Sequence, residues 1–170
     1  FDGVGDAAHT LYRVGVVIEP QGSGAVEHFQ VVQRIFVDDD QVGPLAHFDA
    51  AAVARKPDGT EVTEADREAE RVMRDRLADE RPDHAVLGEE FGTTGPDDAR
   101  FTWVLDPVDG TAGFTIGVPL FGTLVALLED GDPVVGIIHF PALDETVYAA
   151  RGEGCRFRTA DAEMEVSVDT

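Results

Sequence analysis

The sequence predicts an α+β domain with a mostly antiparallel sheet, and three observations lead to this fold class. One segment, residues 63–82, has apolar residues at helical spacing. Most other apolar segments are short and rich in β-branched residues, which is typical of strands. Two of them, within 120–140, are separated by Asp130-Gly131, a dipeptide that favours a tight β-hairpin. A chain of 170 residues, 43% of them hydrophobic, can bury a substantial core.

Residues 1–45 are predicted to form a separate segment with strand-like stretches. Residues 11–18 and 29–37 are apolar and β-branched, and a loop with two glycines lies between them. The acidic stretch at 37–45 is expected to be a solvated connection rather than a metal site. Residues 46–170 are predicted to form the second unit, which contains the remaining predicted elements.

The clearest helix is predicted for residues 63–82. Thr63 is a suitable N-cap, acidic residues follow it in the first turn, and Pro82 comes at the end. One face of this helix carries apolar residues, namely Ala65, Ala69, Val72, Met73 and Leu77. The segment is therefore predicted to be amphipathic.

The strands of the sheet are predicted on the carboxyl side of this helix. Residues 84–88 form a short strand candidate, and residues 101–106 are apolar enough to be central in a sheet. Residues 120–140 are predicted to form the long hairpin. Residues 145–158 indicate two more strands, which turn at the sequence RGEG.

The net charge of −21 limits the partners that this protein can bind. Nucleic acids and anionic membranes would be repelled, and no apolar run reaches the roughly 18 residues of a membrane span. The first residues do not resemble a signal peptide, and the single cysteine, Cys155, fits a reducing compartment, where it is expected to be a small buried residue. We therefore expect a cytoplasmic protein. Because the protein itself is strongly acidic, an acidic substrate would bind only with the help of bound cations.

The sequence WVLDPVDGTAGF places two aspartates around a rigid turn. Its strand delivers Asp106 at the end, the next residue is a proline that forces a bend, and Gly110 allows backbone conformations closed to other residues. Such a turn can direct Asp106, Asp109 and the carbonyl of Val108 to one point, where hard oxygen ligands suit Mg²⁺. The alternative is a plain Asp-Pro turn at a strand end.

Three further features add to this acidic turn. The residues after Gly110 could open a short helix, whose first N–H groups would bind phosphate. The sequence LGEEFG places Glu89 and Glu90 between glycines after a strand, although it could also be a charged surface turn. Asp66 lies in the first turn of the predicted helix, where an acidic residue also stabilises the helix start.

Together, VTEAD, LGEEFG, WVLDPVDGTAGF and GIIHFPALDETVYAARGEG, in this order and spacing, closely resemble the inositol monophosphatase family of Mg²⁺-dependent phosphomonoesterases. The resemblance covers residues 53–160 and implies the layered α/β sandwich of that family. The sequence GVPLFGTLVALLEDGDPVVG is more similar to the histidinol-phosphate phosphatase branch, which acts in histidine biosynthesis. The resemblance thus implies a hydrolase that acts on a small phosphomonoester, and it leaves open whether the protein forms a homodimer.

The resemblance also implies roles for individual residues. Glu89 would ligate a metal ion and, with Thr111, orient the attacking water. Asp106 and Asp109 would hold two Mg²⁺ ions, with Asp109 between them. The carbonyl of Val108 would complete the first metal site.

The remaining roles concern a third ion and the substrate. Asp66 would help to hold a third, more weakly bound Mg²⁺. The backbone amides of Gly110 and Thr111 would receive the phosphate beside Asp109. Glu90 would shape the turn or form part of an outer shell around the site.

Two departures from the family pattern affect these expectations. The family begins with a long helix, whereas strands are predicted in residues 1–45. Its later half carries another metal-binding aspartate after a tryptophan, whereas the one tryptophan here, Trp103, is followed by Val104. We therefore expect an N-terminal half whose C-terminal half is missing. Lys56 would lie on a loop over the site or simply on the surface.

The function predicted from the sequence is that of a Mg²⁺-dependent histidinol-phosphate phosphatase. One alternative is an inositol-1-monophosphatase, which would share the metal and phosphate sites. The other, of a different class, is an inactive fragment that binds Mg²⁺ or phosphate without turnover.

Overall fold

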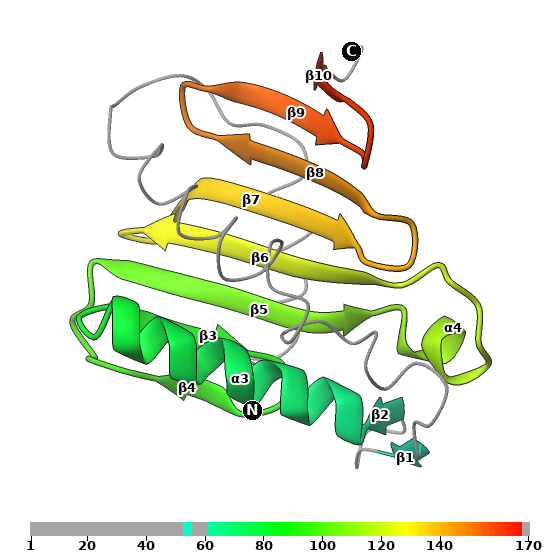
Figure 1. Ribbon diagram of the computed structural model, residues 1–170. Helices are drawn as coiled ribbons and strands as arrows, with labels where there is room; N and C mark the ends of the chain where they lie inside the picture. Colours follow the sequence, from blue (N-terminus) through cyan, green and yellow to red (C-terminus); the bar gives the residue numbers. More distant parts are fainter. Residues whose placement is uncertain (1–52, 56–60, 168–170) are drawn as a thin grey trace.

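The computed structural model describes residues 53–55 and 61–167 (Figure 1). A large sheet fills most of this part of the chain, a long helix lies across one of its faces, and a short helix lies at one end. Several sequence predictions lie outside the described residues, namely the strands at 11–18 and 29–37, the connection at 37–45, and Lys56.

Eight strands form one sheet, in the order β10-β9-β8-β7-β6-β5-β3-β4. Their bounds are β3 Ala85–Gly88, β4 Gly92–Thr94, β5 Phe101–Asp109, β6 Gly122–Glu129, β7 Asp132–Phe140, β8 Glu145–Ala150, β9 Gly154–Arg158 and β10 Glu163–Val166. All neighbouring strands are antiparallel except β3 and β5, which are parallel. A small antiparallel pair, β1 Val53–Arg55 and β2 Glu61–Thr63, precedes the long helix. The prediction of a mostly antiparallel sheet is confirmed.

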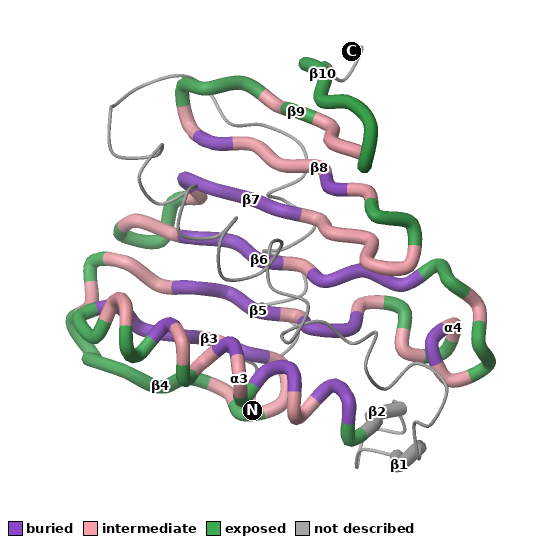
Figure 2. The backbone as a smooth tube through the Cα atoms, viewed as in Figure 1, coloured by how far each residue is buried: buried purple, intermediate pink, exposed green. Residues whose placement is uncertain are grey.

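Helix α3, Glu64–Glu80, confirms the helix predicted at 63–82. It begins directly after Thr63, the predicted N-cap position. Met73 and Leu77 pack against Trp103 of β5, in a cluster that extends across β6 and β7. Figure 2 shows the buried side of α3 turned towards the buried middle of these strands. The buried face also contains Asp66 and Glu70, two acidic residues in a position where charged side chains are rarely found.

The two predicted hairpins are confirmed. β6 and β7 are joined by Asp130 and Gly131, whose φ angles of 51° and 88° are the pair of positive values that a type I′ turn requires. β8 and β9 are joined by a short turn that contains Gly152, with φ 88°. The edge strands β4 and β10 are absent from the sequence prediction, because each is short and carries few buried positions.

Strand β5 differs from the prediction at its carboxyl end. The prediction ended this strand at Asp106 and placed a bend at Pro107, whereas β5 continues to Asp109 with a register shift against β6 between the two aspartates. An irregularity of this kind accommodates a proline, which cannot donate a ladder hydrogen bond. The hydroxyl of Thr123 donates to the carbonyl of Pro107 at 2.9 Å. The two aspartates are therefore presented by an irregular strand rather than by a turn.

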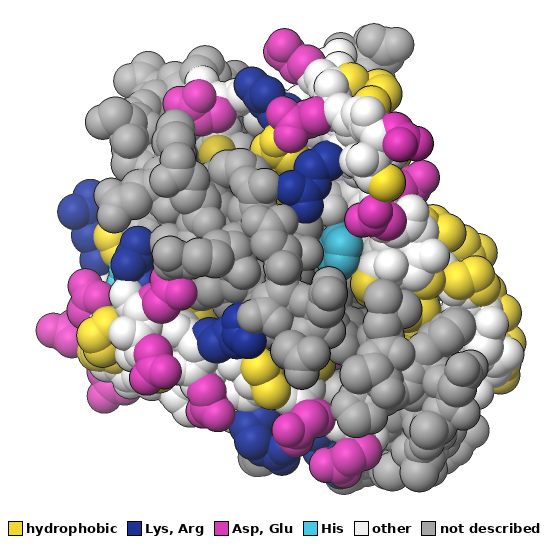
Figure 3. Space-filling model, in the orientation of Figure 1, with side chains coloured by type: hydrophobic (Ala, Val, Ile, Leu, Met, Phe, Trp, Pro, Cys, Tyr) yellow, Lys and Arg dark blue, Asp and Glu magenta, His cyan; other side chains and the backbone are white. Residues whose placement is uncertain are grey.

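The surface of the described part is acidic, with apolar side chains at one end. On the face drawn in Figure 3, acidic side chains lie among arginines, and hydrophobic side chains gather beside the short helix α4, Thr111–Thr115. Ile116 and Leu120, in the loop after α4, are exposed. Cys155 is half-buried, rather than fully buried as predicted. In the part that the structure describes, neither helix is long and apolar enough to cross a membrane.

Candidate active site

The parallel pairing of β3 and β5 brings two acidic segments to the same edge of the sheet. Gly88, the last residue of β3, pairs with Leu105 of β5. Glu89 and Asp106 follow these two residues directly, and the amide of Glu89 donates to the carbonyl of Leu105 at 3.3 Å. The carboxyl ends of neighbouring parallel strands are a frequent place for ligand sites.

The carboxyl group of Asp106 lies in the middle of the acidic residues. Its Oδ1 is buried and has no hydrogen-bond partner among the described residues. Burial has the largest effect on this group, and together with the negative charges of Glu89, Asp109 and Asp66 it raises the pKa of Asp106 to about 8. In the absence of a cation, this environment therefore favours the protonated form of the carboxyl group.

Asp109 shares this environment at the end of β5. Burial raises the pKa of its carboxyl group, and the nearby charge of Glu89 raises it further. The mutual effects show that Glu89, Asp106 and Asp109 are close enough for their charges to repel. The structure thus brings together the carboxylates that the sequence prediction placed in one site.

Thr111 links helix α3 to the end of β5. Its hydroxyl lies 3.0 Å from the carbonyl oxygen of Val108 and 3.3 Å from Oδ1 of Asp66. Asp66 is buried in the first turn of α3, and its carboxylate faces this hydroxyl group. The Val108 carbonyl and the Asp66 carboxylate therefore converge on the same hydroxyl group.

Gly110 makes the sharp connection between β5 and α4. Its φ of 88° is in the left-handed region, and a Cβ atom there would lie 3.1 Å from the carbonyl oxygen of Leu120. The amides of Gly113 and Phe114 donate to the carbonyl of Gly110 at 2.8 and 3.1 Å. Glycine at this position therefore lets the backbone turn directly from the metal-ligand candidates into the helix.

The carboxylate and carbonyl oxygen atoms of this site suit a hard divalent cation in their chemistry. In the described part of the chain, no three His, Cys, Asp or Glu side chains form a ready-made metal-binding group. Mg²⁺ usually keeps several waters and takes only one or two carboxylates from a protein, so it does not need such a group. The buried, unpartnered Oδ1 of Asp106 is the feature that best fits a cation.

Sequence reasoning missed Glu70, which contacts the turn that carries Glu89. Glu70 is fully buried, and its carboxylate accepts hydrogen bonds from the amides of Glu90 and Phe91 at 2.7 and 3.2 Å. A signal was present, because Glu70 follows Asp66 by four residues and falls on the apolar face of the predicted helix. An acidic residue on such a face indicates a buried polar contact.

Comparisons with known proteins agree on one family. Residues 37–170 match the sequence model of the inositol monophosphatase family. A histidinol-phosphatase from Mycobacterium tuberculosis is 50% identical over 99 residues, which are 58% of this chain and 38% of that protein. An inositol-1-monophosphatase from Mesorhizobium japonicum is 40% identical over 102 residues, 60% of this chain and 38% of that protein. The chain thus spans less than half of the length of these curated relatives.

Solved structures have the same fold. The extragenic suppressor protein suhB from Bartonella henselae superposes with a TM-score of 0.71 and 29% identity, covering 78% of this chain and 52% of that protein. An IMPase from Thermotoga maritima gives a TM-score of 0.63 and 35% identity, covering 69% of this chain and 47% of that protein. These likenesses support the layered α/β sandwich that the sequence predicted.

Proposed function

We propose that this chain, which belongs to the inositol monophosphatase family, provides the metal- and phosphate-binding part of a Mg²⁺-dependent phosphomonoester hydrolase. The observation that carries the proposal is the carboxyl group of Asp106, whose Oδ1 is buried without a partner and whose pKa is raised to about 8. Without a ligand, a buried carboxyl group in this position is unfavourable. A divalent cation reverses the local potential and favours the charged form.

The proposed metal ligands are the oxygen atoms gathered at the ends of β3 and β5. Asp106 and Asp109 would hold two Mg²⁺ ions, and Glu89 and the carbonyl of Val108 would complete the first site. Asp66 would contribute to a third, weaker site, since its carboxylate already lies near this group. The ions would also remove the repulsion among these carboxylates, which raises the pKa of Asp106.

The proposed reaction is the transfer of a phosphoryl group from an alcohol to water. Bound Mg²⁺ would polarise the phosphoryl group and lower the pKa of a water molecule. Glu89, together with Thr111, would orient that water for in-line attack on phosphorus. The amides of Gly110 and Thr111 would hold phosphoryl oxygens beside Asp109. A P–O bond to water forms as the ester P–O bond breaks, and the alcohol leaves with a proton.

Histidinol phosphate is the proposed substrate. Three histidinol-phosphatases, which are 44–50% identical to this chain over the matched residues, support this choice. Inositol 1-phosphate is the second candidate, because two inositol-1-monophosphatases are 40% and 42% identical. The shared metal and phosphate site does not distinguish the two alcohols, since substrate specificity lies in the residues around such a site.

The activity is tested with the protein expressed from its complete reading frame, beside residues 1–170 alone. Phosphate release is measured with Mg²⁺ and either histidinol phosphate or inositol 1-phosphate. The complete protein is expected to have a higher kcat/KM on histidinol phosphate than on inositol 1-phosphate. Residues 1–170 alone are expected to have little activity on either substrate. Preference for inositol 1-phosphate would favour the second candidate.

The same assay separates an enzyme from a binding module. If the complete protein binds Mg²⁺ but releases no phosphate from these two substrates or from other sugar and nucleotide phosphates, the hydrolase proposal is wrong and the inactive binding module is correct. Full activity of residues 1–170 would show that the described site is complete by itself.

A further inference from the structure

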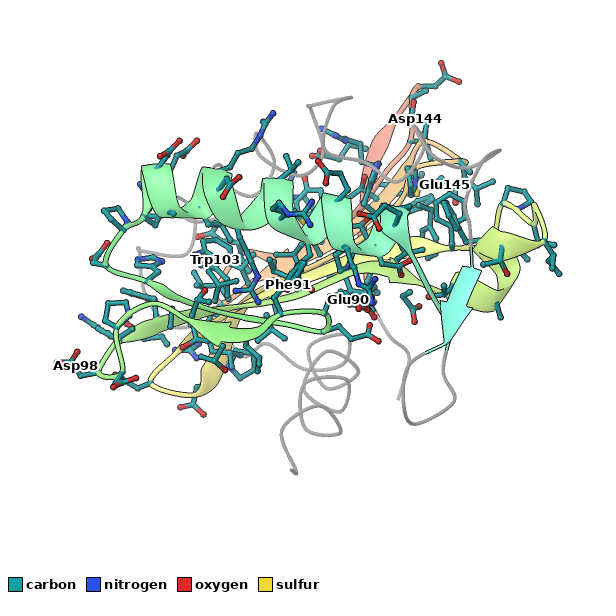
Figure 4. All side chains as sticks on the ribbon, turned by 90° about the horizontal axis from the view of Figure 1, so that it is seen from below. Glu90, Phe91, Asp98, Trp103, Asp144 and Glu145 are labelled. Carbon is teal, nitrogen blue, oxygen red and sulfur yellow. The ribbon has the colours of Figure 1, made fainter. Side chains whose placement is uncertain are left out.

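A buried ion pair on helix α3 holds the turn that follows β3. Oε1 of Glu70 lies 2.7 Å from both Nε and Nη2 of Arg74, one helical turn later. The side chain of Glu70 is fully buried, and that of Arg74 is 12% exposed. Figure 4 shows the two labelled residues of the turn, Glu90 and Phe91, beneath α3.

Both charged groups of this pair are also bonded to the β3–β4 connection. Glu70 accepts the amide hydrogens of Glu90 and Phe91, the two residues that follow Glu89. Arg74 donates to the carbonyl of Gly92 and to the hydroxyl of Thr94. The turn is therefore held at its first amides and at its exit, so that the position of Glu89 is defined from one side.

The space around Gly88 shows how close this contact is. A Cβ atom on Gly88 would lie 2.0 Å from Oε1 of Glu70 and 2.7 Å from Nη2 of Arg74. The carboxylate therefore sits against the backbone immediately before Glu89. Only glycine allows the helix and the strand end to come this close.

The same face of α3 contacts both acidic segments of the site. Asp66 meets Thr111 at the end of β5, and Glu70, four residues later, meets the turn after β3. Residues four apart on a helix lie above one another, about 6 Å apart along the axis. The helix therefore sets the distance between Glu89 and the β5 end that carries Asp106 and Asp109.

A buried ion pair of this kind contributes little to stability, because apolar residues of similar size often replace it at no loss. Its use here is better explained by the geometry that it defines. We infer that Glu70 is a positioning residue, which with Arg74 places Glu89 against the metal ligands of β5. This inference rests on the proposed function, because Glu89 needs a defined position only if it acts with the metal site.

The first test measures Mg²⁺ affinity by titration calorimetry in Glu70→Gln and Glu89→Gln, and in the double variant. Removing a residue that orients a metal ligand typically weakens metal binding by roughly 10- to 100-fold. We expect Glu70→Gln to fall in this range, and to cause no further loss when Glu89→Gln is already present. If Glu70→Gln weakens Mg²⁺ binding by the same factor in the wild type and in Glu89→Gln, its effect is a general destabilisation, and the inference is wrong.

The control is Asp75→Asn, which changes an exposed acidic residue on the same helix and should leave the affinity unchanged. If Glu70→Gln does not fold, Glu70→Gln combined with Arg74→Met removes the unpaired charge and is used in its place.

The second test needs no metal. Amide hydrogen exchange at Glu90 and Phe91 should be faster in Glu70→Gln than in the wild type, and unchanged in Asp75→Asn. Unchanged exchange in Glu70→Gln would overturn the positioning role alone. If exchange is faster in Glu70→Gln but the wild type binds no Mg²⁺, the proposed function is wrong, and the contact holds the turn without serving a metal site.

Discussion

Asp106 lies in an environment that strongly disfavours the negative charge an aspartate usually carries at neutral pH. Its pKa is raised to about 8 from 3.8, first by burial and then by Glu89 and Asp109. The raised pKa means that the folded protein holds a proton that the unfolded chain releases at much lower pH. This difference makes the stability of the metal-free protein depend on pH.

We predict that the metal-free protein loses stability as the pH rises from about 4 to about 8. The protonated form of Asp106 is favoured in the folded state, so its contribution is fully present below the unfolded pKa and is lost as the pH approaches 8. Each released proton changes the free energy of unfolding by at most about 1.4 kcal/mol per pH unit.

The measurement is urea unfolding of the wild type and of Asp106→Asn at several pH values, with a chelator present. The slope with pH should be smaller in Asp106→Asn. Equal slopes in the two proteins would show that Asp106 does not titrate in this range.

Glu89 is the residue to which the proposed reaction assigns the orientation of water. In the complete protein, Glu89→Gln should lower kcat strongly and change KM much less, because the role is exercised on the reacting water rather than on the bound alcohol. Steady-state kinetics with histidinol phosphate measure this split. An unchanged kcat would assign the role to another residue, with Glu90 as the next candidate.

At the scale of single elements, the junction between β5 and α4 determines how the site is presented. Gly110 has the same φ of 88° as Gly131 in the β6–β7 turn. A Cβ atom at Gly110 would meet the carbonyl of Leu120 at 3.1 Å, whereas one at Gly131 would meet nothing within 4 Å. A comparison of alanine substitutions at the two glycines thus distinguishes the cost of backbone strain, which both share, from the cost of a close contact, which arises only at Gly110.

Gly110→Ala should therefore destabilise the protein more than Gly131→Ala. Both changes force alanine into the left-handed region, at about 1–2 kcal/mol each, and only the first adds a close contact. Thermal unfolding of the two variants gives the comparison, and equal losses would mean that the loop at Leu120 relaxes freely. A lower Mg²⁺ affinity is expected only in Gly110→Ala, since Gly131 is far along β6 from the site.

The elements differ in how well the sequence predicts them. Helix α3 and the β6–β7 hairpin follow from local patterns, namely helical spacing and the Asp130-Gly131 turn. Strands β4 and β10 do not, because their few residues gain their structure from pairing at sheet edges. The extension of β5 through Pro107 depends on its irregular pairing with β6, which no local pattern contains.

At the scale of the whole molecule, the acidic site is assembled by contacts between distant segments. The sequence motifs indicated Glu89, Asp106 and Asp109 through a family resemblance, and the structure brings their charges within reach of one another. Glu70 was not predicted, because its role arises only when α3 packs beside the turn after β3. Local chemistry can thus be predicted from motifs, whereas the residues that position it depend on tertiary packing.

The central claim is that these carboxylates form a Mg²⁺ site, and titration calorimetry with Mg²⁺ at neutral pH tests it most directly. We predict that the wild-type chain binds Mg²⁺, and that Asp106→Asn and Asp109→Asn each bind it much more weakly. Without metal, the two variants should be as stable as the wild type or more stable, because the repulsion is relieved. Wild-type Mg²⁺ affinity in both variants would contradict the account.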